Sequence, residues 1–167
     1  MNSYESQYIS SNIDAIGVPF HLWHFTSDKT GRKYIVLVEQ YQENVFAVKF
    51  YPRQFKGHPL RYSVLTGDNE PRTIIMSVIQ IMLHYARKYV NSSFVIIGSP
   101  SVGENKANTK RFRFYQRIIS EYFDNTVFTH VMVEEKSMYM MLRNTEIENG
   151  NISDADVIEF VDSNYCL

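Results

Sequence analysis

The chain of 167 residues lacks the features that mark several protein classes. Its one cysteine, Cys166, leaves no partner for a disulfide within the chain. The five histidines are scattered, so we expect no metal site. No apolar run approaches the roughly 18 residues that cross a membrane, and the first residues lack the charged and apolar regions of a signal peptide. These absences predict a cytoplasmic protein that is not embedded in a membrane and holds no metal ion.

The net charge of −1 conceals an uneven distribution. Residues 144–167 contain six acidic residues and neither lysine nor arginine, which leaves a net charge of +5 on residues 1–143. Apolar residues make up 44% of the chain, enough for one domain with a substantial core. We therefore predict a single domain over residues 1–143, followed by an acidic C-terminal tail over 144–167. This tail either stays solvated or lies on the basic surface of its own domain.

The first half of the chain predicts an antiparallel meander. Four runs are rich in β-branched and aromatic residues and are separated by turn-forming residues: Phe20–Thr26, Tyr34–Tyr41, Val45–Tyr51 and Leu60–Thr66. Residues 1–16 are polar with scattered apolar positions, which predicts a loose helix or a segment lying along the body.

The second half alternates helices with strands. Apolar residues at three- and four-residue spacing predict helices over Pro71–Tyr89, capped by Asp68 or Asn69, and over Thr109–Phe123, capped by Asn108 or Thr109. Phe94–Ile97 is a short, wholly apolar strand, and Val127–Val133 with Met138–Arg143 predicts a hairpin. Ser153 and Asp156 resemble a capping box of a short helix in the tail. The fold class is therefore α+β: a mixed, mostly antiparallel sheet of six to seven strands with two main helices.

The loop and helix start that follow Phe94–Ile97 predict an anion site. The first N–H groups of a helix lack partners within it, and the helix dipole favours negative charge there. The surrounding residues that we expect to bind the anion are Ser99, Gly103, Asn108, Lys110, Arg111 and Arg113. The alternative is that the basic residues form only a solvated helix face.

Other catalytic patterns are incomplete. Gly98 and Gly103 are spaced as in a nucleotide-binding phosphate loop, but Glu104 stands where that loop needs lysine. Ser99 with His84 or His130 could be named nucleophile and base, although nothing in the sequence brings them together. A serine in a structural turn is the simpler interpretation.

The order β-β-β-β-α-β-α-β-β resembles the GNAT acyltransferase superfamily, over residues 20–143. The superfamily often carries Asn-x-x-Ala-x-x-Phe-Tyr on its second conserved helix, and Asn108, Phe114 and Tyr115 match that pattern, with Arg111 in place of the small residue. The resemblance implies that Tyr115 is the general acid toward a leaving thiolate, and that acyl-CoA is the cofactor. It also implies that Leu60–Thr66 and Phe94–Ile97 pair in parallel and separate at the ligand site, with Pro71–Tyr89 as the crossover.

One stretch departs from the superfamily. The pyrophosphate of acyl-CoA is bound there by a glycine-rich loop before the first conserved helix, whereas this chain has Asp68 and Glu70, which repel phosphate, and Pro71, which has no N–H. We therefore expect no cofactor to be held tightly, and acyl-CoA only weakly.

Three functions stay open at this point. The first is a GNAT-like domain that binds an anionic small molecule or a protein partner, the second an active N-acyltransferase, and the third a module that binds protein or nucleic acid. Nucleic acid is the less favoured partner because the basic residues are few.

Overall fold

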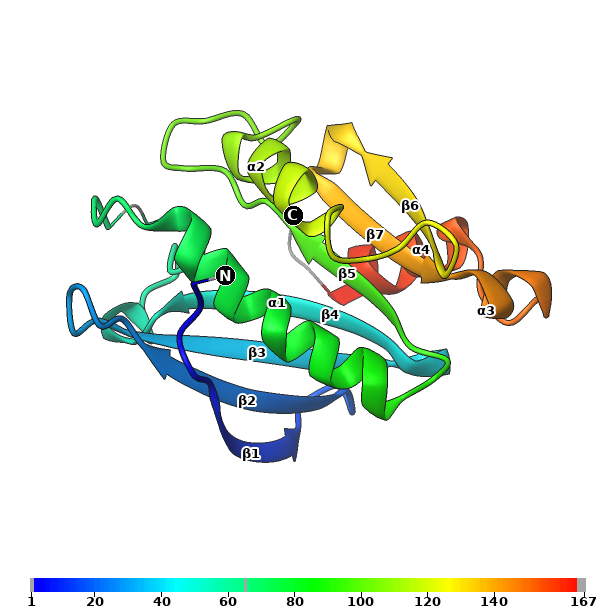
Figure 1. The fold of residues 1–167 in the computed structure, drawn as a ribbon. Helices are drawn as coiled ribbons and strands as arrows, with labels where there is room; N and C mark the ends of the chain where they lie inside the picture. The colour runs from blue at the N-terminus through cyan, green and yellow to red at the C-terminus, as the bar shows by residue number, and fades with distance from the viewer. Residues whose placement is uncertain (1, 65, 165–167) are drawn as a thin grey trace.

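One seven-stranded mixed sheet forms the centre of the molecule (Figure 1). The computed structural model describes residues 2–64 and 66–164. Its strands and helices, in chain order, are β1 Gln7–Ile13, β2 Pro19–Thr26, β3 Lys33–Tyr41, β4 Val45–Pro52, α1 Pro71–Lys88, β5 Ser93–Ile97, α2 Lys110–Ile119, β6 Phe128–Val133, β7 Met138–Arg143, α3 Asn144–Glu148 and α4 Asp154–Asn164. The predicted α+β class and the mixed sheet are confirmed.

The strands lie in the order β1-β2-β3-β4-β5-β7-β6. Every neighbouring pair is antiparallel except β4 and β5, which run parallel from Val45↔Ser93 to Val48↔Ile96. A parallel pair needs a crossover connection, and α1 supplies it. Since β4 continues to Pro52 while β5 ends at Ile97, the two strands stop pairing well before β4 ends.

The prediction of a strand over Leu60–Thr66 is wrong. Among the described residues of this segment, the amides of Arg61 and Ser63 donate to the carbonyls of His58 and Leu60, which makes consecutive turns. The Arg61 guanidinium lies over the ring of Tyr62, 4.8 Å from its centroid, a stacking that an extended pair of neighbours cannot make. The parallel partner of β5 is consequently β4 and not this segment.

Residues 7–13 do not form the loose helix that was one of the two expectations for this segment. They form the edge strand β1, antiparallel to β2. Most of β1 is exposed, so its residues do not show the alternation of apolar and polar positions that marks a half-buried strand. Its backbone hydrogen bonds to β2 determine its conformation.

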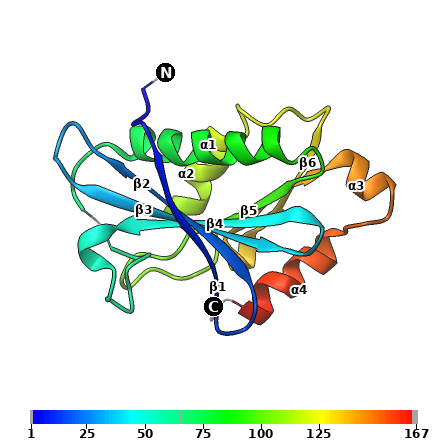
Figure 2. The same cartoon turned by 90° about the horizontal axis from the view of Figure 1, so that it is seen from below.

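Helices cover both faces of the sheet (Figure 2). α1 and α2 lie on one face, over a core that includes Phe46, Val48 and Phe94. α4 lies on the other face, where Val157 and Val161 are fully buried against alternate strand residues such as Val45. The segment predicted as an acidic tail therefore folds into helices as far as residue 164, while residues 165–167 lie outside the described residues.

The acidic side chains of α4 do not lie on the basic start of α2, because the two helices occupy opposite faces of the sheet (Figure 2). Asp162 pairs instead with Lys136 in the β6–β7 connection, at 2.7 Å. The predicted start of the C-terminal helix is confirmed, since the Asp156 amide donates to Ser153 Oγ at 3.2 Å.

Candidate functional site

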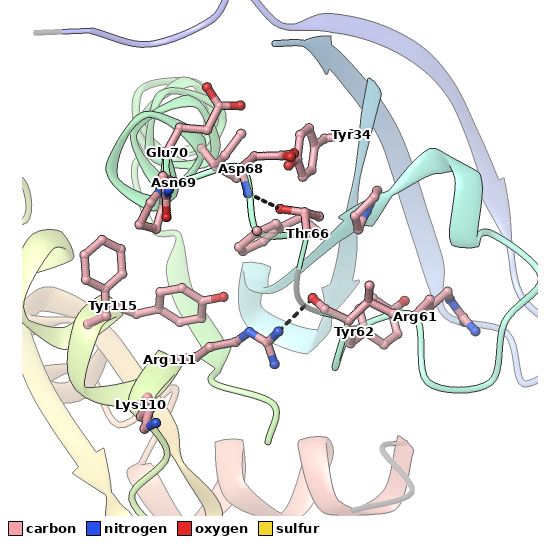
Figure 3. Close-up of a pocket in the computed structure, with 17 residues that line it drawn as sticks. Tyr34, Arg61, Tyr62, Thr66, Asp68, Asn69, Glu70, Lys110, Arg111 and Tyr115 are labelled. Carbon is pink, nitrogen blue, oxygen red and sulfur yellow. Dashed lines mark hydrogen bonds between the residues drawn. The ribbon is translucent and has the colours of Figure 1, made fainter. Parts of the chain in front are cut away.

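A cavity of about 450 Å³ opens where β4 and β5 stop pairing. Five parts of the chain line it: Tyr34 of β3, the end of β4, described residues between 61 and 70, the first turns of α1 and the first turns of α2. Figure 3 shows the side chains of these parts converging on one space. The cavity is the geometric consequence of two parallel strands that diverge while helices cover one side of the gap.

Aromatic side chains form much of the cavity wall. They come from β3, β4, the segment 61–70 and α2, and are Tyr34, Phe50, Tyr62, Phe114 and Tyr115. The Phe50 and Tyr115 rings pack together with their centroids 5.8 Å apart, and Ile74 of α1 adds an aliphatic surface. An apolar group entering this space exchanges water for ring faces, which is favourable at about 25 cal/mol per Å² of apolar area removed from water.

Positive charge exceeds negative charge at the cavity. Lys110, Arg111 and Arg61 line it together with two acidic residues, Asp68 and Glu70. Arg32, which lies outside, pairs with Asp68 at 2.7 Å, and this hydrogen-bonded ion pair lowers the pKa of Asp68.

The second acidic residue, Glu70, lies buried at the start of α1. It accepts a hydrogen bond from the Tyr4 hydroxyl at 2.6 Å, and its carboxylate is directed away from Arg111 and Tyr115 (Figure 3). Within residues 2–64 and 66–164, the ion pairs found include neither Lys110 nor Arg111.

Arg111 connects two walls of the cavity. Its two terminal nitrogens donate to the carbonyl oxygens of Ser99 and Val64, each at 2.9 Å. Figure 3 draws one of these two bonds as the dashed line from Arg111. These bonds hold the loop after β5 and the segment 61–70 beside α2. Both acceptors are neutral, so these two bonds do not compensate the guanidinium charge, and they leave three of its five N–H donors unused. The pKa of Glu104 is lowered by the amide hydrogen bonds that it accepts and, to a lesser degree, by the charge of Arg111.

Tyr115 extends from α2 into the cavity and is only 7% exposed (Figure 3). Burial raises the pKa of Tyr115 to about 12, and the charge of Arg111 acts in the opposite direction. The phenol is therefore protonated at neutral pH and can donate a hydrogen bond or a proton to a group in the cavity.

The start of α2, predicted as the anion site, is capped by the chain itself. Thr109 is the N-cap, and its Oγ1 accepts from the Phe112 amide at 3.1 Å. Both oxygens of the Glu104 carboxylate accept amide hydrogen bonds at 3.0 Å, from Ser101 and Lys110, which lowers the pKa of Glu104. An internal carboxylate thus lies where an external anion was expected.

The predicted site residues, the six ligand residues and the catalytic candidate Tyr115, consequently divide into two groups. Lys110, Arg111 and Tyr115 line the cavity, and Ser99 is joined to it through Arg111. Gly103, Asn108 and Arg113 are exposed and are not among the lining residues; the Arg113 guanidinium donates to the Asn108 carbonyl.

Two residues that the sequence did not single out bind the junction before α1. Arg32 and Lys29, from the turn between β2 and β3, bind the Asp68 carboxylate and its carbonyl oxygen. Asp68 and Asn69 are therefore not the N-cap of α1, contrary to prediction; Glu70 occupies that position without a side-chain capping bond. Positions 32 and 68 are far apart in the sequence, and no local pattern joins them.

Comparisons with protein-family models, curated proteins and solved structures find no match. Among the helices of residues 2–64 and 66–164, none is both long and apolar enough to span a membrane. The same residues contain no cluster of three or more His, Cys, Asp or Glu suited to a metal ion. The geometry of the cavity therefore carries the functional argument.

Proposed function

We propose that this chain is a GNAT-like domain that binds an anionic small molecule in the cavity between the end of β4, α1 and α2. The observation that carries the proposal is the pair Lys110 and Arg111, two cations that take part in none of the ion pairs found within residues 2–64 and 66–164, at a cavity whose wall is largely aromatic. The parallel β4–β5 pair, the crossover helix α1 and a cavity at the divergence of the strands support the GNAT-like arrangement.

The ligand has two parts in this proposal. Its anionic group accepts hydrogen bonds from Arg111 and Lys110, and each charge-assisted bond contributes about 1.5–3 kcal/mol. Its apolar part lies against Phe50, Phe114 and Ile74. An anion without an apolar part gains only the hydrogen bonds to Arg111 and Lys110. Alkyl phosphates and alkyl carboxylates therefore bind more tightly than inorganic phosphate.

Acyl-CoA in its usual pose is disfavoured by the junction before α1. The Asp68 carboxylate with its partner Arg32 occupies this junction, and Pro71 supplies no N–H at the first helical position. A pyrophosphate there would have to displace an internal ion pair. We therefore expect no tight binding of acetyl-CoA.

N-acyl transfer is the second candidate, and the position of Tyr115 favours it. In that reaction an amine attacks the thioester carbonyl, the carbon–sulfur bond breaks, and a general acid protonates the departing thiolate. The Tyr115 hydroxyl is protonated and directed into the cavity (Figure 3), which are the two properties that such an acid requires.

Thermal-shift measurements with octyl phosphate test the first candidate. A ligand at 100 times its Kd stabilises the folded state by about 2.7 kcal/mol, so octyl phosphate should raise the Tm clearly and inorganic phosphate should not. The double variant Lys110→Ala/Arg111→Gln should lose this rise, because glutamine at position 111 keeps an amide donor for the carbonyl of Val64 or Ser99 but carries no positive charge.

The matched control is Arg113→Ala, which removes an exposed cation of the same helix that does not line the cavity. It should respond to octyl phosphate as the wild type does. A full response in the double variant, or an equal response to uncharged octanol, would show that these two cations do not bind the ligand.

Calorimetry with acetyl-CoA tests the second candidate. Micromolar affinity would overturn the expectation of weak binding and would make Tyr115→Phe the decisive variant. Loss of the acid should then lower turnover by about 10²-fold or more and leave acetyl-CoA affinity nearly unchanged.

A further inference from the structure

The strands β1, β2 and β3 form one edge of the sheet (Figure 1). They carry a second group of polar side chains. Ser11 Oγ is 2.6 Å from His21 Nδ1, and His21 Nε2 is 3.2 Å from Gln40 Oε1. This order, a serine followed by a histidine and an amide oxygen, is the arrangement by which proteins activate a serine hydroxyl. The cavity residues take no part in it.

The hydrogen bonds beyond Gln40 determine which nitrogen of His21 carries the proton. Asn44 Nδ2 donates to Asn91 Oδ1 at 2.8 Å, so Asn44 Oδ1 is free to accept from Gln40 Nε2, at 2.9 Å. Gln40 Oε1 is then the acceptor that faces His21, and it requires a proton on Nε2. His21 Nδ1 is left with a lone pair directed at the Ser11 hydroxyl, as a general base must be.

A β-bulge brings this serine to the face that carries the histidine. Tyr8 pairs with Trp23 and Ser11 pairs with His21, while the register shifts between Tyr8 and Ser10. Residues three apart on a regular strand point to opposite faces, but the extra residue in the bulge puts Tyr8 and Ser11 on the same face. Their hydroxyl groups are hydrogen-bonded to each other.

Aromatic packing holds the neighbours of Ser11 in place. The Tyr8 ring meets Trp23 edge to face with centroids 5.6 Å apart, and Trp23 Nε1 donates to the Tyr85 hydroxyl of α1 at 2.9 Å. The His21 ring lies 5.7 Å from the Tyr85 ring. Ser11 itself is exposed and open to reagents from solvent.

We propose that Ser11 is a nucleophilic serine, with His21 as its general base and Gln40 as the positioning residue, and that it accepts acyl or phosphonyl groups from activated esters. Ser11 Oγ bonds to the acyl carbon, its proton passes to His21 Nδ1, and the carbon–oxygen bond to the leaving group breaks. His21 then returns the proton to the departing oxygen. A water molecule, deprotonated by His21, then attacks the acyl carbon of the acyl-serine. The bond to Ser11 Oγ breaks, the carboxylic acid leaves, and His21 returns the proton to Ser11.

The Tyr8 hydroxyl is the donor nearest to the reacting oxygen. It donates to Ser11 Oγ when the serine hydroxyl points at His21, and it is positioned to donate to the oxyanion that forms beside that atom. Tyr8→Phe should therefore slow acylation without abolishing it.

Labelling with a fluorophosphonate reagent, read by intact mass and peptide mapping, tests the proposal. Formation of the serine–phosphorus bond expels fluoride, so one adduct per chain should appear on Ser11 and be absent in Ser11→Ala. General-base catalysis contributes about 10²–10⁴-fold, and His21→Gln should slow labelling within that range. Ser10→Ala is the matched control, because Ser10 is the adjacent serine paired with Leu22 on the opposite face, and it should label as the wild type does.

Gln40 is tested by a pair of variants. Gln40→Leu should slow labelling because Nε2 loses its acceptor, whereas Gln40→Glu keeps an acceptor and should retain the wild-type rate or exceed it. An adduct at another residue, no adduct above that of Ser11→Ala, or a rate unchanged in His21→Gln would each overturn the proposal. Melting temperatures of all variants show whether the fold is kept.

Discussion

Gly98 lies where β5 ends and α2 packs on the sheet, and the change Gly98→Ala tests how closely the two elements meet. A Cβ at this position would lie 2.2 Å from the backbone nitrogen and 2.6 Å from the Cα of Phe112. Non-bonded carbon atoms prefer about 3.5–4.0 Å. Because the atoms in the way belong to the backbone, no change of rotamer relieves the overlap, and α2 has to retreat from β5.

The expected cost follows from what this retreat breaks. Overpacking a core costs about 1–3 kcal/mol, and the bond from Thr109 Oγ1 to the Gly98 carbonyl, 2.6 Å long, contributes about 1 kcal/mol more. The free energy of unfolding should fall by about 2–4 kcal/mol. For a chain of this size 1 kcal/mol corresponds to about 2–4 °C, so the Tm should fall by roughly 4–16 °C.

Urea and thermal denaturation followed by circular dichroism measure this loss. The control is Gly57→Ala, where an added Cβ meets nothing within 4 Å and the backbone φ is not positive. It should be neutral or stabilising by about 0.4–1 kcal/mol, because alanine has a smaller unfolded-state entropy than glycine. If Gly98→Ala stays within about 0.5 kcal/mol of wild type, the close approach of α2 to β5 is wrong, and with it the position of Arg111 and Tyr115.

Two further predictions concern stability. Val161→Asp places a carboxylate at a fully buried position of α4 and should lower the free energy of unfolding by about 3 kcal/mol or more, measured in urea, whereas Ala155→Asp on the exposed side of the helix should change it little. Asp68→Asn should lower the Tm at pH 7. Arg32 holds the pKa of Asp68 below its ordinary 3.8, so the carboxylate stabilises the folded state above pH 3.8, and this contribution is lost as the pH falls through the lower folded value. The difference in Tm between wild type and Asp68→Asn should therefore shrink below pH 3.8, and a difference unchanged at pH 2 would contradict the Arg32–Asp68 pairing.

Elements with a strong local pattern could be predicted from the sequence. The apolar stripe of α1 and the Thr109 cap of α2 are encoded within a few residues, and the predicted bounds differ from the observed ones by only a few positions. The strand β5 was equally clear, because Phe94–Ile97 is apolar throughout and lies in the middle of the sheet, covered on both faces.

The number of strands before α1 was right because two errors cancelled. Leu60–Thr66 has a strand-like composition. Stacking of Arg61 on Tyr62 and the bond from Arg111 to the Val64 carbonyl instead hold the described residues of this segment in an irregular conformation at the cavity. β1 has the sequence Gln-Tyr-Ile-Ser-Ser-Asn-Ile and is almost entirely exposed, so no pattern of buried residues marks it as a strand. Pairing with β2 makes it one. In both segments contacts to distant residues decide the structure.

The residues of the candidate site also divide into those that one helix brings together and those that contacts between distant parts of the chain bring together. Lys110, Arg111 and Tyr115 share the first turns of one helix, so the sequence could place two cations and a phenol together. It could not show that Glu104 already accepts hydrogen bonds at the helix terminus, nor that Arg32, from outside the cavity, pairs with Asp68. Because of the Glu104 bonds, the expected anion site lies in the cavity and not at the helix terminus. With the amides of Ser101 and Lys110 bonded to Glu104, the helix terminus has few donors to offer, and selectivity for an anion has to come from the side chains of Lys110 and Arg111. The cavity site should therefore lose its ligand when Lys110 and Arg111 are substituted and keep it in Arg113→Ala. The second result separates this proposal from the anion site first expected at the start of α2, which included Arg113.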